Sequence, residues 1–170
     1  SQDLCYIAHQ ILIKRIMEIM DLSKAVQLAI VFSGVFLWIG MLTGVWKYWQ
    51  IRRSELSRAH YYVDIAHRSS LLYAAATLIL AVLSYFTILN EDIALWCVLA
   101  NILFFSFSIL VYIIHGFLQD TTNQFKQPHR LGHFSLPTWL MTFMMFALII
   151  TELLATVILV MGTILLFLSK

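Results

Sequence analysis

The stretch RAHYYVDIAHRSS holds two histidines and an aspartate, His60, Asp64 and His67, whose spacing would place them on one face of an α-helix. Imidazole and carboxylate groups bind cofactors or exchange protons near neutral pH. Arg68 stands four residues after Asp64, which is the spacing of a helical ion pair. We therefore expect a polar site in which Asp64 and Arg68 are candidate catalytic residues that orient the histidines or move protons. The alternative is that the pair only anchors the helix at the membrane interface.

A second polar group stands far away in the sequence, at the end of the apolar segment that runs into IIHGFLQD. His115 and Asp120 belong to it, and His129 and His133 follow in the next loop. If the helices run antiparallel, both groups reach the same face of a membrane. The candidate cofactor-binding residues are then His60, His67, His115 and Asp120. The simpler interpretation of His60, His129 and His133 is that they are solvated loop residues.

Three kinds of chemistry fit these residues. Two histidines on different helices, His67 and His115, can be the axial ligands of haem b. Alternatively, His67, Arg68 and Asp64 can bind the polar head of a quinone or a similar lipid-soluble substrate, with histidine as proton donor or acceptor. A divalent cation is the third option, but the spacing matches no standard metal signature, so we predict no metal site. The first two options are redox chemistry and would place the protein in electron transport.

Glu152 is the one charged residue expected near the middle of an apolar segment. A carboxyl group there should be neutral or paired, because an isolated charge is costly in lipid. Glu152 is therefore a third candidate catalytic residue, as a proton carrier, and Asn101 is a candidate hydrogen-bond partner. The alternative is that Glu152 only forms a hydrogen bond between helices, which is common in membrane bundles.

The composition of the 170-residue chain indicates what must hold these side chains in place. Hydrophobic residues make up 61% of the chain and charged residues 12%, whereas soluble domains hold roughly 45–50% and about 25%. The mean hydropathy is +0.86. These values predict an integral membrane protein in contact with the lipid bilayer. The net charge of +2 gives no reason to expect a nucleic-acid partner.

Four segments are long and apolar enough to cross a membrane as helices, which takes about 20 residues each. They cover residues 25–46, 69–89, 93–117 and 137–169. The last is longer than one crossing requires, so it must tilt or project from the bilayer. The polar–apolar alternation of strands is not seen. The sequence therefore predicts an all-α fold, an integral membrane four-helix bundle formed by residues 25–170.

Residues 1–24 precede this bundle. Their apolar residues recur at nearly every turn around Lys14, Arg15 and Glu18, which fits an amphipathic helix that lies in the membrane interface. Met17 and Met20 are alternative start sites, and the residues before them would then be an extension. Both interpretations stay open.

The loops differ in positive charge, which predicts the orientation of the bundle. Loop one, between the first two spans, and loop three, before the last span, carry Lys and Arg, whereas the link LNED carries none; the charged residues are Lys47, Arg52, Arg53, Arg58, Lys126 and Arg130. Lys and Arg collect in cytoplasmic loops, so we expect loops one and three on the cytoplasmic side. An aromatic belt on that side would be formed by Trp46, Tyr48, Trp49, Tyr61, Tyr62 and Trp139.

Gly40 and Gly44, in the sequence GMLTG, have the spacing that lets membrane helices approach closely. We expect a helix contact there. GMLTG, followed by AH at residues 59–60, is also similar to the opening of hydroxylaminobenzene mutase-type four-helix proteins. The run AHRSS resembles the His-Arg-Ser/Thr stretch in the membrane anchors of the succinate dehydrogenase family, through residues 67–69, and this resemblance implies binding of quinone and often haem. An extra span precedes the run here, and HGFLQD does not reproduce the second motif of that family.

The leading hypothesis is a small membrane redox subunit that binds haem b or quinone at the face of loops one and three. A second is a non-catalytic accessory subunit that packs against other subunits of a membrane complex, because the short loops leave little material for a soluble catalytic domain. A third is a small membrane enzyme that uses the His/Asp cluster for acid–base isomerisation. Whether the protein is an enzyme stays open.

Overall fold

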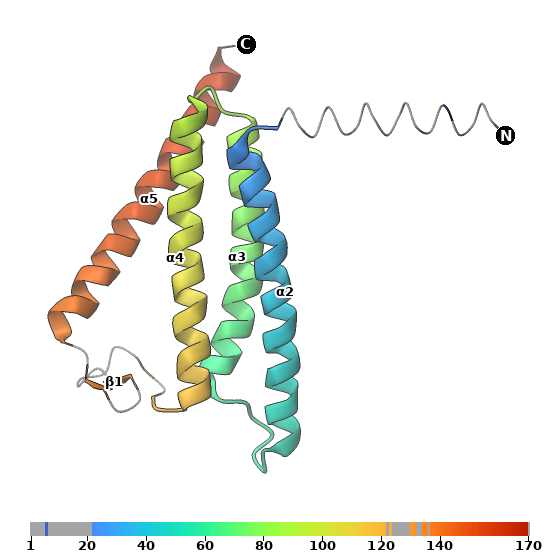
Figure 1. The fold of residues 1–170 in the computed structure, drawn as a ribbon, viewed down its shortest axis with the longest axis vertical. Helices are drawn as coiled ribbons and strands as arrows, with labels where there is room; N and C mark the ends of the chain where they lie inside the picture. Colours follow the sequence, from blue (N-terminus) through green and yellow to red (C-terminus); the bar gives the residue numbers. More distant parts are fainter. Residues whose placement is uncertain are drawn as a thin grey trace.

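A computed structural model shows four long helices arranged as a bundle (Figure 1). It describes residues 6, 22–121, 123, 130–131, 134–135 and 137–169. The elements are α2 (Lys24–Arg53), α3 (Tyr61–Tyr85), α4 (Glu91–Leu118), the short strands β1 (Arg130–Leu131) and β2 (Phe134–Ser135), and α5 (Thr138–Leu168). All four helices are long and apolar enough to cross a membrane. The predicted four-helix membrane fold is thereby confirmed, while the interfacial helix expected over residues 1–24 falls almost wholly outside the described residues.

Local sequence signals explain where these helices begin and end. The side chains of Ser23, His60 and Asn90 each accept a hydrogen bond from a backbone N–H in the first turn of the helix that follows. Pro137 precedes α5, and Gln119 ends α4 in a left-handed conformation with φ of 49°. Because α3 begins directly after His60, the polar stretch before the apolar segment forms its first turns.

The contact between α2 and α3 is the most extensive in the bundle. It is close because glycine faces α3 at two successive turns of α2. A methyl group on Gly40 would lie 2.6 Å from Cδ2 of Leu71, and one on Gly44 would lie 2.8 Å from Cε1 of His67. The helix contact predicted from the spacing of the two glycines is confirmed.

Helix α5 is attached to the bundle along only one half. Its buried residues all lie in its C-terminal half: Ala155, Leu159, Gly162 and Thr163. The backbone N–H of Ile88 donates to the carbonyl oxygen of Gly162 at 3.3 Å, which joins α5 to the link between α3 and α4. From 138 to 154 no residue is buried, and this half of α5 leans away from α4 (Figure 1).

The connection between α2 and α3, the end of α4 and the start of α5 lie at one end of the bundle (Figure 1). We call this the loop-one end and define it by residues 54–60 and 119–121. The link between α3 and α4 and the C-terminus lie at the opposite end. The hairpin threading that brings His60 and His115 to one end is therefore confirmed, whereas His129 and His133 lie outside the described residues.

Candidate functional site

Asp64 pairs with one cation from each of two helices. Its Oδ1 lies 2.6 Å from Nζ of Lys47 on α2, and its Oδ2 lies 2.5 Å from Nη2 of Arg68, one turn further along α3. The Arg68 side chain is 66% exposed, whereas Lys47 and Asp64 are 31% and 27% exposed. The helical pair expected from the sequence is present, and Lys47 extends it to α2. Because both carboxylate oxygens are held by cations, this triad clamps α2 to α3.

His67 lies on the same face of α3 as Asp64 and is held against α2. Its Nδ1 lies 2.7 Å from the carbonyl oxygen of Gly40. A carbonyl only accepts hydrogen bonds, so Nδ1 carries the proton and Nε2 is the basic atom of the ring. The ring fills the space beside Gly44, where a side chain would collide with it. His67 is thus a packed residue of the interface between α2 and α3.

His115 and Asp120 form a more deeply buried pair at the loop-one end. Nδ1 of His115 lies 2.8 Å from Oδ1 of Asp120, and the two side chains are only 5% and 9% exposed. The left-handed conformation of Gln119 ends α4 directly before Asp120 and turns the chain. A carboxylate that accepts from Nδ1 of a histidine fixes the tautomer and leaves the lone pair on Nε2.

Tyr62 packs with this buried pair and is not part of the predicted aromatic belt. It is 3% exposed. Its ring centroid lies 5.0 Å from that of His115 and 6.1 Å from that of Tyr112, one turn further into the bundle. Tyrosine at a helix start is ambiguous in sequence, because an interfacial ring and a buried ring give the same pattern.

His60 lies next to the His115–Asp120 pair. Burial lowers the pKa of His60 from its ordinary value of 6.5, the Asp120 carboxylate opposes this shift, and His115 adds to it. Nδ1 of His60 accepts a long hydrogen bond of 3.4 Å from the backbone N–H of Tyr62. Both observations fit a neutral imidazole at pH 7 whose proton is on Nε2.

A surface pocket of about 480 Å³ opens beside His60 at the loop-one end. It is lined by Trp49, Gln50, Arg53, Ser54, Leu56, Arg58, Ala59, His60 and Gln119. The guanidinium of Arg53 lies 3.9 Å from the centroid of the Trp49 ring. The pocket therefore combines an aromatic wall with several hydrogen-bond donors. His60 lines the pocket and also interacts with the buried pair of His115 and Asp120.

Glu152 lies deeper in the bundle, on α5. Its Oε1 is buried and has no hydrogen-bond partner among the described residues. Its electrostatic neighbours are Tyr73 of α3 and Tyr112 of α4. Tyr112 and Ser108 are also polar neighbours of the Tyr73 side chain. Sequence reasoning missed both tyrosines, although Tyr112 stands three residues before His115 and thus shares its face of α4.

Asn101, the partner expected for Glu152, is engaged elsewhere. Its Nδ2 donates to the carbonyl oxygen of Cys97 at 2.9 Å, and its Oδ1 accepts from Thr156 at 3.4 Å. Thr156 stands one turn beyond Glu152 on α5. The interhelical hydrogen bond predicted for this depth exists, but Thr156 makes it.

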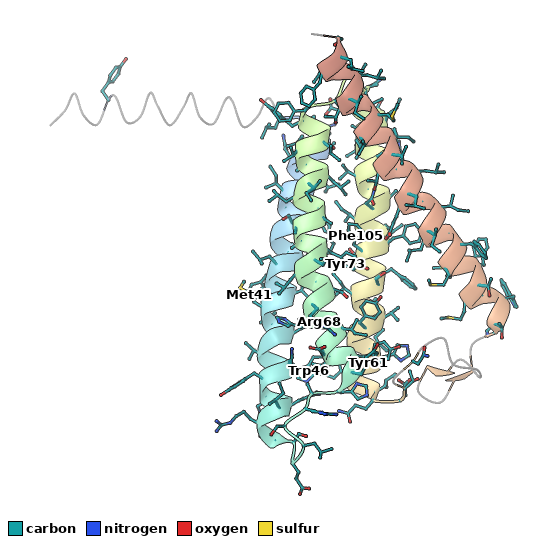
Figure 2. All side chains as sticks on the ribbon, turned by 180° about the vertical axis from the view of Figure 1, so that it is seen from behind. Met41, Trp46, Tyr61, Arg68, Tyr73 and Phe105 are labelled. Carbon is teal, nitrogen blue, oxygen red and sulfur yellow. The ribbon has the colours of Figure 1, made fainter. Side chains whose placement is uncertain are left out.

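The candidate residues thus fall into three groups along the bundle. His60, His115 and Asp120 gather at the loop-one end, Asp64, His67 and Arg68 lie in the α2–α3 interface, and Glu152 lies among tyrosines farther in. Figure 2 shows the order along the axis, from Trp46 and Tyr61 near the loop-one end, through Arg68, to Tyr73 and Phe105. The last two rings are stacked, with centroids 4.4 Å apart.

No protein-family model, curated protein or solved structure matches the chain. The fold itself defines the class: a multi-pass membrane protein with four candidate spanning helices.

Proposed function

We propose that this protein binds the polar head of a lipid-soluble molecule of the quinone class at the loop-one end, as a small membrane redox subunit. The observation that supports this most is the position of His60. It lines an open pocket and lies beside the buried His115–Asp120 pair. A head group that gains or loses protons needs such groups between water and the bundle interior.

Each residue has a separate part in this proposal. The neutral imidazole of His60 contacts the head group and can donate from Nε2. Asp120 holds the proton of His115 on Nδ1, so that Nε2 of His115 is the atom that takes up or releases a proton. Arg53 and Arg58 line the pocket and can donate to carbonyl oxygens of the head group, and the ring of Trp49 can stack on it.

The packing of the histidines favours a head group over haem. Axial ligation by His67 and His115 needs both imidazoles to face one space from opposite sides. The ring of His67 is held against Gly40 and Gly44 of α2, whereas the ring of His115 packs on Tyr62 of α3. Haem binding at these two residues would require the α2–α3 contact to open.

The direct test is a titration of the full chain in lipid nanodiscs with a short-chain benzoquinone, followed by quenching of tryptophan fluorescence. We expect saturable binding that weakens about ten-fold in Asp120→Asn, because the charge-assisted hydrogen bond that orients His115 is lost. Asp92→Asn is the matched control, since Asp92 is exposed at the opposite end, and its binding should equal that of the wild type. Absence of saturable binding would overturn the proposal.

Two further measurements separate the competing ligands. The arginines of the pocket could also hold the phosphate of an anionic lipid, in which case adding phosphatidylglycerol to the nanodiscs would abolish quinone binding. A Soret band in the purified protein that is lost in His67→Ala or His115→Ala would show haem ligation and would contradict our choice of head group.

An accessory subunit is the second candidate function, and one observation favours it. The half of α5 from 138 to 154 buries no residue against the described part of the bundle. Another membrane subunit could pack against it. Co-purification of a stoichiometric membrane partner, lost when Phe146 and Ile150 are changed to alanine, would support this function; isolation of the protein alone from native membranes would count against it.

The proposed orientation places loops one and three in the cytoplasm, because four Lys and Arg residues lie between positions 47 and 58 and the link between α3 and α4 carries none. In this orientation the pocket exchanges protons with the cytoplasm.

A further inference from the structure

Arg68 is a charged side chain on the outside of α3, at the edge of the apolar segment that crosses the membrane. It is 66% exposed, and the apolar segment 69–89 begins at the next residue. On α2, Lys47 directly follows the apolar segment 25–46. Because Arg68 and Lys47 both contact Asp64, the three charges lie at one level of the bundle, where the hydrocarbon core of a bilayer gives way to the head groups.

This triad has positive charge in excess. Two cations share the one carboxylate of Asp64, so the group has a net charge of +1. Nη2 of Arg68 contacts Asp64, but a guanidinium has five N–H donors. Since the Arg68 side chain is mostly exposed, it has donors left for a ligand outside the bundle. Phospholipids place phosphate groups at this level, and a guanidinium binds phosphate through two parallel hydrogen bonds.

An apolar stripe runs along α3 from Arg68 into the membrane interior. Leu72, Ala75, Ile79 and Val82 follow Arg68 at helical spacing, and all four are exposed. We call these four residues the apolar stripe. Because α3 runs from the loop-one end toward the opposite end (Figure 1), an acyl chain that extends inward from a phosphate at Arg68 would lie along the apolar stripe.

We propose that Arg68 binds the phosphate of an anionic phospholipid whose acyl chain lies along the apolar stripe. Lys47 adds a second positive charge to the site. Asp64 holds the guanidinium at the head-group level and competes with the lipid for its N–H groups. A zwitterionic lipid carries a cation beside its phosphate and therefore gains less from the net charge of the triad. The site does not depend on the pocket beside His60 or on the molecule that binds there.

The test is native mass spectrometry of the full chain in detergent micelles that hold equal amounts of phosphatidylglycerol and phosphatidylcholine. The measured quantity is the ratio of the two lipids that stay bound to the protein. We expect the wild type to prefer phosphatidylglycerol about ten-fold, as a charge-assisted hydrogen bond would give, and Arg68→Gln to lose this preference. Arg52→Gln is the matched control, because Arg52 is an exposed residue of α2 outside the triad, and its ratio should equal that of the wild type.

Asp64→Asn separates a lipid site from a merely structural ion pair. It removes the carboxylate that competes for Arg68 and leaves both cations, so the preference for phosphatidylglycerol should rise about five-fold, the equivalent of an exposed ion pair. Arg68→Lys keeps the charge and should retain most of the preference. A lower preference in Asp64→Asn would overturn the proposal, as would a preference that survives in Arg68→Gln.

Two other binding modes give different results. Displacement of phosphatidylglycerol by an excess of inorganic phosphate would show a site for free phosphate in which the apolar stripe has no part, and would overturn the proposal. If Arg53→Gln removes the preference and Arg68→Gln keeps it, the lipid occupies the pocket, and the site at Arg68 is rejected.

Discussion

His67 donates a hydrogen bond from Nδ1 to the carbonyl oxygen of Gly40 across the α2–α3 interface, at 2.7 Å. The bond exists because glycine at positions 40 and 44 leaves room for an imidazole where other residues would place a side chain. A histidine that sequence spacing marks as a cofactor ligand thus serves to fit two helices together. Its role can be separated experimentally from that of His115.

Gly44→Ala should destabilise the protein. The new methyl group would lie 2.8 Å from Cε1 and 3.0 Å from Nδ1 of His67, and overpacking of this kind costs about 1–3 kcal/mol. Gly34→Ala is the matched control, because a methyl group there has no atom within 4 Å and should stabilise the helix by up to about 1 kcal/mol. Equal unfolding free energies of the two variants, from denaturant titrations in one detergent, would refute the tight contact at Gly44.

Lys47 and Asp64 should show energetic coupling in a double-mutant cycle. With Lys47→Met and Asp64→Asn we expect a coupling of about 1 kcal/mol, typical of a well-formed and partly shielded ion pair. The control cycle combines Asp64→Asn with a substitution of Arg52, an exposed residue of the same helix, in place of Lys47→Met. This control cycle should give no coupling. Strictly additive effects of Lys47→Met and Asp64→Asn on the unfolding free energy would show that the triad does not clamp α2 to α3.

His60 should make stability depend on pH in a defined direction. Its pKa is lowered in the folded protein, so the unfolded chain binds more protons below the ordinary value of 6.5. Its contribution to stability is therefore complete above pH 6.5 and is lost as the pH falls toward the lower folded value. His60→Asn keeps a helix-capping side chain and should remove this part of the pH dependence of unfolding. A steeper loss of stability in the variant at acidic pH would contradict the assignment.

Cysteine labelling should place the two loops on opposite sides of the membrane. In a background without Cys5 and Cys97, Leu56→Cys should react with a membrane-impermeant thiol reagent only after cells are opened, because loop one is proposed to be cytoplasmic. Ile88→Cys, in the link between α3 and α4, should react in intact cells. The reverse pattern would invert the orientation and leave the bundle unchanged, whereas labelling of both positions from one side would contradict the topology.

The helices and their threading could be predicted from the sequence because they follow from the length of apolar segments. The spacing of Asp64 and His67 also predicted a shared face of α3 correctly, whereas His60 precedes the helix as its N-cap residue and lies beside the His115–Asp120 pair. Spacing along one helix does not say which neighbour that face meets, however. The sequence therefore left open whether His67 faces a cofactor or α2, and only the fit of its ring beside Gly44 shows that it meets α2.

The surroundings of Glu152 were predicted less well, for a related reason. The depth of a residue in the membrane can be estimated from its position along its helix. Asn101 and Glu152 have similar depths on this basis, so Asn101 was predicted to be the hydrogen-bond partner of Glu152. The lean of α5 changes which residues meet: Thr156 reaches Asn101, and Glu152 instead faces Tyr73 and Tyr112. The tilt of α5 cannot be read from its hydropathy.

Nitrogen-15 NMR of histidine-labelled protein in nanodiscs tests the proposed site most directly. Titration with a short-chain benzoquinone should shift the resonances of His60 and His115, each identified by substitution, with Nδ1 of His115 protonated throughout, and should leave the resonances of His67 in place. Shifts at His67 without shifts at His60 and His115 would contradict a head-group site at the loop-one end, as would a spectrum that the quinone does not change.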